Sequence, residues 1–567
     1  MKKNAAVANT MLQPWRYRVV LAVLAVLACI LVFRLVGLQL AQGEGGVDYL
    51  QRAGDARSLR TVQNAAHRGM ISDRNGRPLA ISTPVKSLWI EPKKIQAEKV
   101  FVLAQALGLD VDKLSGKIAK NATKEFLYVA RQLAPSKADE IMQFDINGLH
   151  AATEYKRYYP AADVSAHLLG FTDTDDRGVD GLEWTYNTML SGKSGTKRVL
   201  KNRRGEIIQH IESVREVAHG EDLQLSIDLR LQYYAHKELK AAVEKFGAKS
   251  GSVVVLDVHS NEVLAMVNEP TFNPNERSTL DMETVRNRAV TDVFEPGSTM
   301  KPLAMIAALE SGRYTPNTVI DTSPGYISVE GKLLADSSNY GQLDLTGILS
   351  KSSQVGTSKI ALDLGGPAIR GVLQRFGLGQ SLATGFPGES FGSLPDYTSW
   401  HPLHTVTMAY GYGVSATPLQ LAQCYSILAN KGLRKDVSLV RVSDPVYSER
   451  VVDEQLVTQI NHMLAEATKQ GGTGTRATTE RYSVAGKTGT LHRLGKQGYE
   501  GDRYVAVFAG FAPAANPRLA AAVFIDDPGV GTYYGGEVAA PVFSRIVGES
   551  LRLLNVAPDA LQLATAH

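Results

Sequence analysis

The stretch GSVVVLD at residues 251–257 decides the fold class of the second half of the chain. Its apolar, β-branched residues predict a buried strand, which His259–Glu262 turns into a second strand at Val263–Val267. Two more strands are predicted near the far end of the chain, at Tyr504–Phe508 and Leu519–Ile525. Strands therefore stand at both sequence ends of this region.

Helical patterns lie between the two groups of strands, at Ser298–Glu310, Leu345–Leu364 and Pro418–Asn430. Strands at both ends of a domain with helices between them predict one sheet that is closed by its first and last segments. We therefore expect an α/β sandwich. It begins at a boundary near residues 215–222, where mixed, charged sequence gives way to clear strand and helix patterns.

The region before this boundary is different, because residues 41–220 are mixed, charged and divided into many short segments. Helical periodicity is clear at Glu98–Leu107 and weaker at Pro135–Met142. We expect a separate domain here, which ends at this boundary.

The amino-terminal region predicts a membrane anchor. Residues 1–18 contain four basic residues and no acidic one, and Val19–Phe33 is uninterrupted apolar sequence that continues past Arg34 to about Leu40. A helix needs about 20 residues to cross a bilayer core. We therefore predict a transmembrane anchor at 19–40 and, from the positive-inside bias, a cytoplasmic tail at 1–18.

Two other interpretations of this apolar run are a cleavable signal peptide and a lipoprotein signal. A signal peptide would need a small-x-small cleavage site, which Phe33-Arg34-Leu35 does not offer. A lipoprotein would turn polar after Cys29, whereas the apolar run continues beyond it. An uncleaved anchor is the interpretation we carry forward.

Composition excludes several classes of protein. The 567 residues include 61 Lys+Arg and 57 Asp+Glu, and the net charge of +4 is too small for a nucleic-acid-binding protein. The two cysteines, Cys29 and Cys424, allow neither a disulfide framework nor a cysteine-based zinc site. The 12 histidines show no metal-ligand spacing, so we predict no metal and no cofactor.

The segment Phe294–Pro302 contains the main candidate for chemistry. Pro296-Gly297 ends an extended stretch, so Ser298 stands where the next helix begins and Lys301 shares its helix face. A neutral lysine can take the proton of a serine hydroxyl when burial and a second cation lower its pKa. The pattern alone is weak, since Ser194–Lys197 also matches it in what we expect to be a solvated turn.

A second cation is offered by Val484–Thr490, which is predicted to be a strand edge with small residues. Lys487 can lower the pKa of Lys301 and bind a substrate carboxylate, while the amides of Ser298 and Thr490 form an oxyanion hole.

A third element lies between these two segments. In the predicted helix 345–364, Ser352 is the candidate proton relay and Gln354 a hydrogen-bonding amide. Ser337-Ser338-Asn339 is a rival, but it lies in a polar loop, and we prefer Ser352.

These three segments, in this order, resemble the Ser-x-x-Lys, Ser-x-Asn and Lys-Thr-Gly motifs of penicillin-binding proteins. Other stretches extend the resemblance over nearly the whole chain. Arg68–Ala80 resembles the opening motif of class B members, Arg157–Pro160 and Gly178–Tyr186 resemble their pedestal motifs, and Phe294–Gly297, Ala409–Gly413 and Gly471–Arg476 resemble the division-specific branch of Gram-negative bacteria.

The resemblance implies a penicillin-recognising transpeptidase domain, with an antiparallel sheet flanked by helices, at 221–567. This domain would stand on an elongated α+β pedestal of the dimerisation type at 41–220, with one N-terminal transmembrane helix. The implied activity is that of a serine-type peptidoglycan D,D-transpeptidase. Ser298 would attack the D-Ala-D-Ala end of a stem peptide, an amine of a neighbouring stem would take the acyl group during septal wall synthesis, and β-lactams would acylate the same serine.

The resemblance also implies a role for each site residue. Lys301 would be the base for acylation, Ser352 and Gln354 would line the site, and Lys487 with Thr488, Gly489 and Thr490 would bind the substrate. The implied location is the inner membrane, with the N-terminus cytoplasmic and the catalytic domain periplasmic. The implied partners are a membrane-embedded glycan polymerase, whose helix Arg34 would meet, and other divisome proteins.

One residue departs from the family pattern, since Gln354 stands where the family has asparagine. In the family this amide contacts both the lysine and the substrate. The extra C–C bond displaces the amide by about 1.5 Å, and misplacement near 1 Å costs on the order of 10² in rate. The departure implies an altered substrate or β-lactam preference, or weak activity.

Several alternatives follow from the same residues. A weakly active or inactive paralogue would act as a divisome scaffold, and a D,D-carboxypeptidase would use the same site with water as the acceptor. A β-lactamase would need a deacylating base, and the only similar pattern, at Glu183 and Asn187, lies far before Ser298 in the predicted pedestal. A bifunctional enzyme would need a glycosyltransferase domain, for which no paired-acid motif precedes residue 220.

Overall fold

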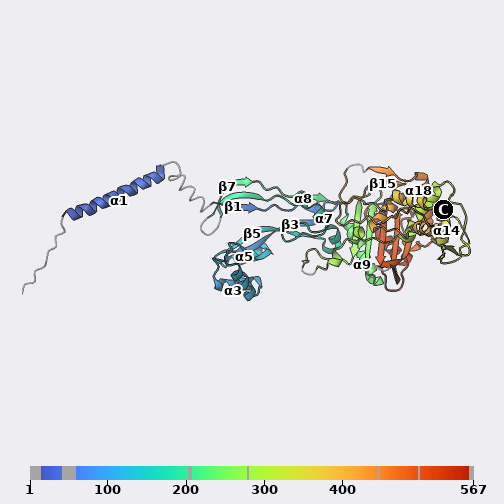
Figure 1. Cartoon of the computed structure of the whole chain (residues 1–567), viewed down its shortest axis with the longest axis horizontal. Coiled ribbons are helices and arrows are strands. Elements are labelled where there is room, and N and C mark those ends of the chain that lie inside the picture. The colour runs from blue at the N-terminus through green and yellow to red at the C-terminus, as the bar shows by residue number, and fades with distance from the viewer. Residues whose placement is uncertain are drawn as a thin grey trace, which may run out of the picture. The chain divides into compact units, whose positions relative to one another are not determined.

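The computed structural model describes residues 14–40, 59–201, 207–277, 280–443, 447–495 and 498–560 (Figure 1). These residues form two compact units. The first contains the described residues before His67 together with those of Lys193–His219, and the second contains those of His67–Gly192 and of Gly220 onward.

The first unit contains helix α1 and a three-stranded sheet. Helix α1 runs from Pro14 to Leu40 and includes the predicted span, and it is long and apolar enough to cross a membrane. The sheet is antiparallel in the order β1-β6-β7, formed by Leu59–Asn64, Gly195–Lys201 and Ile207–Arg215. The expected turn at Ser194–Lys197 is therefore wrong for most of its length, because β6 pairs with β1 from Gly195 onward.

The second unit begins with a sheet in the order β4-β3-β2-β8, in which β5 also pairs with β3. Its strands are β2 (Ile71–Ser72), β3 (Pro78–Ile90), β4 (Leu127–Leu133), β5 (Leu149–Tyr158) and β8 (Leu223–Gln224). Helices α3 (Ala97–Leu107), α4 (Val111–Lys120) and α5 (Pro135–Met142) pack on β3 and β4 around a cluster that includes Leu88, Leu103 and Ile141. The helices predicted at 98–107 and 135–142 are confirmed.

A buried carboxylate connects three distant parts of this region. Glu183 has no exposed surface, and its two oxygens each lie 2.6 Å from an arginine Nε, those of Arg68 and Arg157. A buried charge is tolerated when it is fully paired in this way. The three stretches that resemble the class B opening and pedestal motifs thus meet at one carboxylate.

The second sheet of this unit has the order β10-β9-β19-β18-β17, and all its strand pairs are antiparallel. Its strands are β9 (Ser250–Asp257), β10 (Val263–Glu269), β17 (Ala485–Gly495), β18 (Gly498–Ala512) and β19 (Leu519–Asp526). The first strands pair with the last, because β9 lies beside β19, as the sequence predicts. The expected antiparallel sheet flanked by helices is confirmed.

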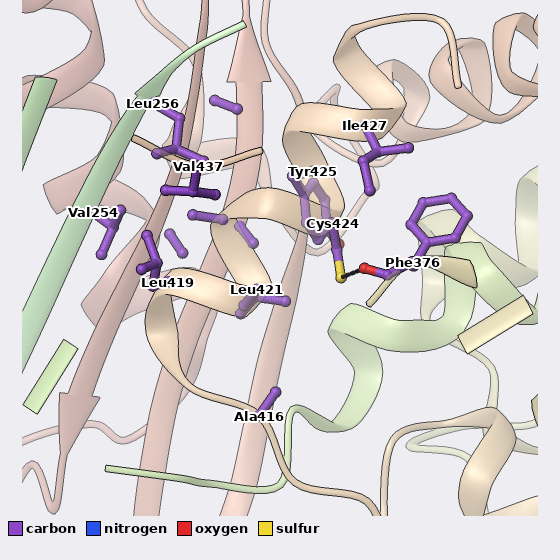
Figure 2. Close-up of a cluster of buried hydrophobic side chains, with 14 of the residues drawn as sticks. Val254, Leu256, Phe376, Ala416, Leu419, Leu421, Cys424, Tyr425, Ile427 and Val437 are labelled. Atoms are coloured by element: carbon purple, nitrogen blue, oxygen red, sulfur yellow. Dashed lines mark hydrogen bonds between the residues drawn. The ribbon is translucent and has the colours of Figure 1, made fainter. Parts of the chain in front are cut away.

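The sheet is buried on both faces, since side chains of β9 alternate between two cores. Val253 and Val255 pack with α9 (Leu229–Phe246) and α19 (Gly535–Leu553). Val254 and Leu256 face the other core, which contains α17 (Pro418–Ala429) (Figure 2).

Helix α17 also supports the candidate nucleophile. Tyr425 is buried in this core (Figure 2), and its phenol donates a hydrogen bond of 2.9 Å to the carbonyl of Thr299. The neighbouring Cys424 contacts the carbonyl oxygen of Phe376, and burial raises the pKa of its thiol to about 12. A thiol so protonated is a packing group rather than a nucleophile.

The single helix predicted at Leu345–Leu364 is wrong, because two helices form there. Helix α13 ends at Lys351 and α14 begins at Gln354. Ser352 between them adopts a left-handed φ of +59°, and the hydroxyl of Ser353 caps α14 by accepting from the amide of Gly356. A serine hydroxyl competes with the helix for main-chain donors, and this interrupts an apolar pattern that is otherwise continuous.

Candidate active site

The candidate nucleophile Ser298 stands on a tight turn. A 3₁₀-helix spans Gly297–Met300 and leads directly into α12, Lys301–Glu310, and the amide of Lys301 donates to the carbonyl of Ser298. In a 3₁₀ turn, side chains at i and i+3 eclipse. The half-buried Ser298 and the buried Lys301 therefore lie on the same side of this turn.

Glycine is required at the start of this turn. Gly297 has φ +55°, and a Cβ there would lie 2.0 Å from Cδ2 of Leu491. Its amide donates to the carbonyl of Gly411 at 2.9 Å. The position of Ser298 is thus determined by close packing of Gly297 against the side chain of Leu491 and the backbone of Gly411.

Lys301 is 2% exposed, and its ammonium contacts Ser352. Nζ lies 2.5 Å from the carbonyl oxygen of Ser352 and 3.2 Å from its Oγ. Burial lowers the pKa of Lys301 to about 7, against the opposing effect of the Asp336 carboxylate. The amine is therefore close to half-neutral at physiological pH.

Lys487 has no exposed surface. It lies on β17, which is an edge strand of the five-stranded sheet β10-β9-β19-β18-β17. Its Nζ is 3.3 Å from the hydroxyls of Thr473 and Thr488 and from the carbonyl oxygen of Thr488. Burial, and then the charge of Lys301, hold the pKa of Lys487 well below its usual range. Two lysines that are 186 positions apart in the sequence thus repel each other in one buried site.

The strand that carries Lys487 lies against the nucleophile turn. A Cβ at Gly489 would lie 3.2 Å from Cγ2 of Thr299 and 3.3 Å from the carbonyl oxygen of Pro296. The hydroxyl of Thr490 accepts from the amide of Gly535, at the start of α19. A glycine at 489 therefore lets the edge strand pack directly against the nucleophile turn.

The Ser352–Gln354 junction completes the arrangement. The Asp336 carboxylate accepts a hydrogen bond of 2.6 Å from the hydroxyl of Ser353. It also accepts from the main-chain N–H groups of Gln354 at 2.5 Å and Val355 at 3.1 Å. The break between the two helices turns the carbonyl and hydroxyl of Ser352 toward Lys301. A non-glycine residue at positive φ costs about 1–3 kcal/mol, and the bonds from Asp336 and the capping Ser353 hold this conformation in place.

The rival motifs show no contact with the two buried lysines among the described hydrogen bonds. Ser337 is in the loop after β13 (Lys332–Ala335), where its hydroxyl pairs with the phenol of Tyr340. Ser194 belongs to the other compact unit. The structure thus brings together Ser298, Lys301, Ser352 and Lys487.

Two contributors were not predicted as site residues. Thr473 accepts from both Lys487 and, at 2.8 Å, the hydroxyl of Thr488. Its loop is held by Lys351, which donates to the carbonyl of Gly471. Asp336 is the other. Thr473 lies within the Gly471–Arg476 stretch that resembles the division-specific branch, whereas no pattern in the sequence singles out Asp336.

Comparison with known proteins agrees with this geometry. Residues 251–548 match the model of the penicillin binding protein transpeptidase domain, and residues 63–225 match that of the penicillin-binding protein dimerisation domain. The chain belongs to the penicillin-binding protein transpeptidase family. The resemblance seen in the sequence is confirmed.

Relatives of this penicillin-binding protein include curated enzymes and solved structures. It is 41% identical over 555 residues to the peptidoglycan D,D-transpeptidase FtsI of Escherichia coli, covering 96% of this chain and 93% of that protein. It is 40% identical to the transpeptidase domain of Burkholderia pseudomallei penicillin-binding protein 3, with a TM-score of 0.55 over 59% of this chain and 97% of that one. Penicillin-binding protein 3 of Mycobacterium tuberculosis, solved in complex with aztreonam, is 27% identical, with a TM-score of 0.68 over 88% of this chain and 98% of that chain.

Proposed function

We propose that this penicillin-binding protein is a peptidoglycan D,D-transpeptidase that forms an acyl-enzyme on Ser298 and cross-links stem peptides during septal wall synthesis. The observation that supports this most directly is the buried lysine pair beside the nucleophile turn. Lys301, with its pKa lowered to about 7, follows Ser298 by one turn and contacts Ser352.

In the acylation step, Oγ of Ser298 attacks the carbonyl carbon of the penultimate D-Ala. The hydroxyl proton passes to neutral Lys301, whose lowered pKa suits a general base near neutral pH. The C–N bond to the last D-Ala then breaks, and the proton reaches the leaving amine through the hydroxyl of Ser352, which lies 3.2 Å from Lys301 Nζ. An amine of a second stem attacks the ester, forms the new amide and regenerates the serine.

Lys487 and Thr488 bind the terminal carboxylate of the donor stem. A carboxylate beside Lys487 favours the charged amine, so substrate binding raises the pKa that burial lowers. The amides of Ser298 and Thr490 stabilise the developing oxyanion, and Gly489 lets the peptide approach the strand. An oxyanion donor is typically worth about 10²–10³ in rate.

The proposal places the protein in the inner membrane as a single-pass protein. Support comes from α1, which is 27 residues long, and from the basic residues at its N-terminal side. The tail at 1–18 would then be cytoplasmic. Residues 41–220 would form the pedestal and 221–567 the transpeptidase domain in the periplasm.

We also propose that Arg34 of α1 contacts a membrane-embedded glycan polymerase, which would supply the strands for cross-linking beside other divisome proteins. Arg34 is exposed within an otherwise apolar segment, where an unpaired charge is costly. Arg34→Leu should lose co-purification with a polymerase from solubilised membranes, whereas Arg16→Leu should retain it. Retention by both variants would mean that Arg34 only snorkels to the interface.

The proposed activity is tested by labelling the full chain, in detergent, with a fluorescent penicillin. Mass spectrometry should locate one adduct on Ser298, and Ser298→Ala should abolish it while Ser194→Ala retains it. With a donor pentapeptide and an acceptor amine, a cross-linked product supports transpeptidation, and hydrolysis alone would identify a carboxypeptidase. If the folded wild-type chain forms no adduct, the alternative of an inactive paralogue that acts as a divisome scaffold is favoured.

A further inference from the structure

Helix α17 and the residues that lead into it contact the nucleophile segment on both sides of Ser298. Before the serine, the main chains of Phe294 and Ala416 exchange two hydrogen bonds, of 3.0 and 2.9 Å. After the serine, the phenol of Tyr425 donates a hydrogen bond of 2.9 Å to the carbonyl of Thr299. One element of the core therefore holds the nucleophile segment at two points.

Helix α17 is a rigid support. Every residue from Pro418 to Ala429 is buried, and Thr417 and Gln420 form a reciprocal capping box at the start of the helix. Tyr425 lies among the buried side chains of this core (Figure 2). Since a close-packed interior leaves side chains little freedom, packing determines where the phenol lies.

The carbonyl of Thr299 depends on a donor from outside its own helix. Met300 is the N-cap of α12, so its carbonyl takes the first helical hydrogen bond, and the carbonyl of Thr299 lies one residue too early. A 3₁₀ pattern would pair Thr299 with the amide of residue 302, but Pro302 has no N–H. Thr299 is 1% exposed, and a buried carbonyl without a partner is costly. Tyr425 thus supplies the donor that Pro302 lacks.

The carbonyl that Tyr425 holds belongs to the peptide unit between the two reacting side chains. This unit joins Thr299 to Met300, and it lies within the turn that separates Ser298 from Lys301. Proton transfer needs the hydroxyl and the amine within hydrogen-bond reach. Because misplacement near 1 Å costs on the order of 10² in rate, a turn that loses this restraint should react more slowly.

Resting on the proposed function, we propose that Tyr425 is a positioning residue, which holds the turn between Ser298 and Lys301 in the geometry that acylation requires. It acts through the main chain of Thr299. Its hydroxyl is needed because residue 302 is proline, so an amide N–H at that position should make the hydroxyl largely dispensable. Initial binding, which the proposed function assigns to β17, should not depend on it.

The test separates binding from acylation in the full chain in detergent. Titration with a fluorescent penicillin gives the initial binding constant and the maximal acylation rate. Tyr425→Phe keeps the ring and removes the hydroxyl, so the maximal rate should fall by about tenfold. The initial binding constant should change by less than about twofold, because the lost interaction orients the reacting groups only.

Tyr482→Phe is the matched control. Tyr482 is 3% exposed, and its phenol also donates a hydrogen bond of 2.9 Å to a main-chain carbonyl, that of Val556. Both variants lose one comparable hydrogen bond, so both should lower the Tm by a similar amount. Only Tyr425→Phe should slow acylation.

Pro302→Ala provides a rescue, because it returns a main-chain N–H to residue 302. In this background, Tyr425→Phe should slow acylation by less than about threefold, since the carbonyl of Thr299 has a second donor. A general loss of packing would not be relieved by an N–H at residue 302.

Each outcome has a separate meaning. A maximal rate in Tyr425→Phe within about twofold of the wild type, or an equal loss in Tyr482→Phe, would overturn the inference alone. If Tyr425→Phe does not fold, Pro302→Ala and the double variant carry the test, and a difference of about tenfold between them would overturn it. No acylation of Ser298 in the folded wild type would overturn the proposed function and the inference with it.

Discussion

The rate at which Ser298 is acylated should follow the deprotonation of Lys301. Burial lowers the pKa of Lys301 to about 7, and only the neutral amine can accept the serine proton. Its neutral fraction then rises from about 0.1 at pH 6 to about 0.9 at pH 8. We therefore expect a rise of about tenfold in acylation rate over this range and a plateau above it.

A lysine with an ordinary pKa would behave differently. With a pKa near 10.5, its neutral fraction would rise about a hundredfold from pH 6 to pH 8 and would keep rising beyond. Because Lys301 and Lys487 repel each other, the observed midpoint belongs to the pair. The shape of the profile still separates the two cases.

The assay is single-turnover labelling of the full chain with a fluorescent penicillin, in buffers from about pH 5.5 to pH 9.5. Asp336→Asn tests the direction of the pKa shift, because the carboxylate of Asp336 raises the pKa of Lys301. Its removal should move the midpoint to lower pH. A rate that still climbs tenfold per unit above about pH 8.5, or an upward shift in Asp336→Asn, would refute the reasoning.

Three further predictions concern stability and binding. Lys301→Met should abolish acylation yet raise the Tm, because the Lys301 amine has a pKa of about 7 in the folded protein and an ordinary pKa in the unfolded chain. Calorimetry should show that the gain in Tm is largest below pH 7 and fades toward about pH 10.5. Thr473→Val removes a hydroxyl that accepts from Lys487, so penicillin titrations should show weaker initial binding, by about two- to tenfold, with a maximal acylation rate that changes little. Gly297→Ala puts a Cβ at positive φ and 2.0 Å from Leu491, so denaturant unfolding should show a loss of about 1–3 kcal/mol, and an unchanged midpoint would contradict the packing.

Local patterns were sufficient for much of the fold. The apolar run at 251–257 forms a strand because its β-branched residues suit a sheet that is buried on both faces, and α1 forms where the apolar run is long enough. The proximity of Ser298 and Lys301 is equally local, since three residues along a helical turn bring two side chains together. Such features depend on neighbours within one or two turns, which a sequence displays directly.

The rest depends on contacts between distant segments. Lys487 meets Lys301 only because β17 forms the edge of the sheet and lies against the nucleophile turn. The break at Ser352 was missed because the apolar pattern runs through it, whereas Asp336 and Ser353 supply the capping bonds that interrupt the helix. Thr473 was not recognised as a site residue, because its contact with Lys487 depends on a loop that meets β17 only in the folded chain. Burial of two amines in one place lowers their pKa values, and burial is a property of the packed chain rather than of any one segment.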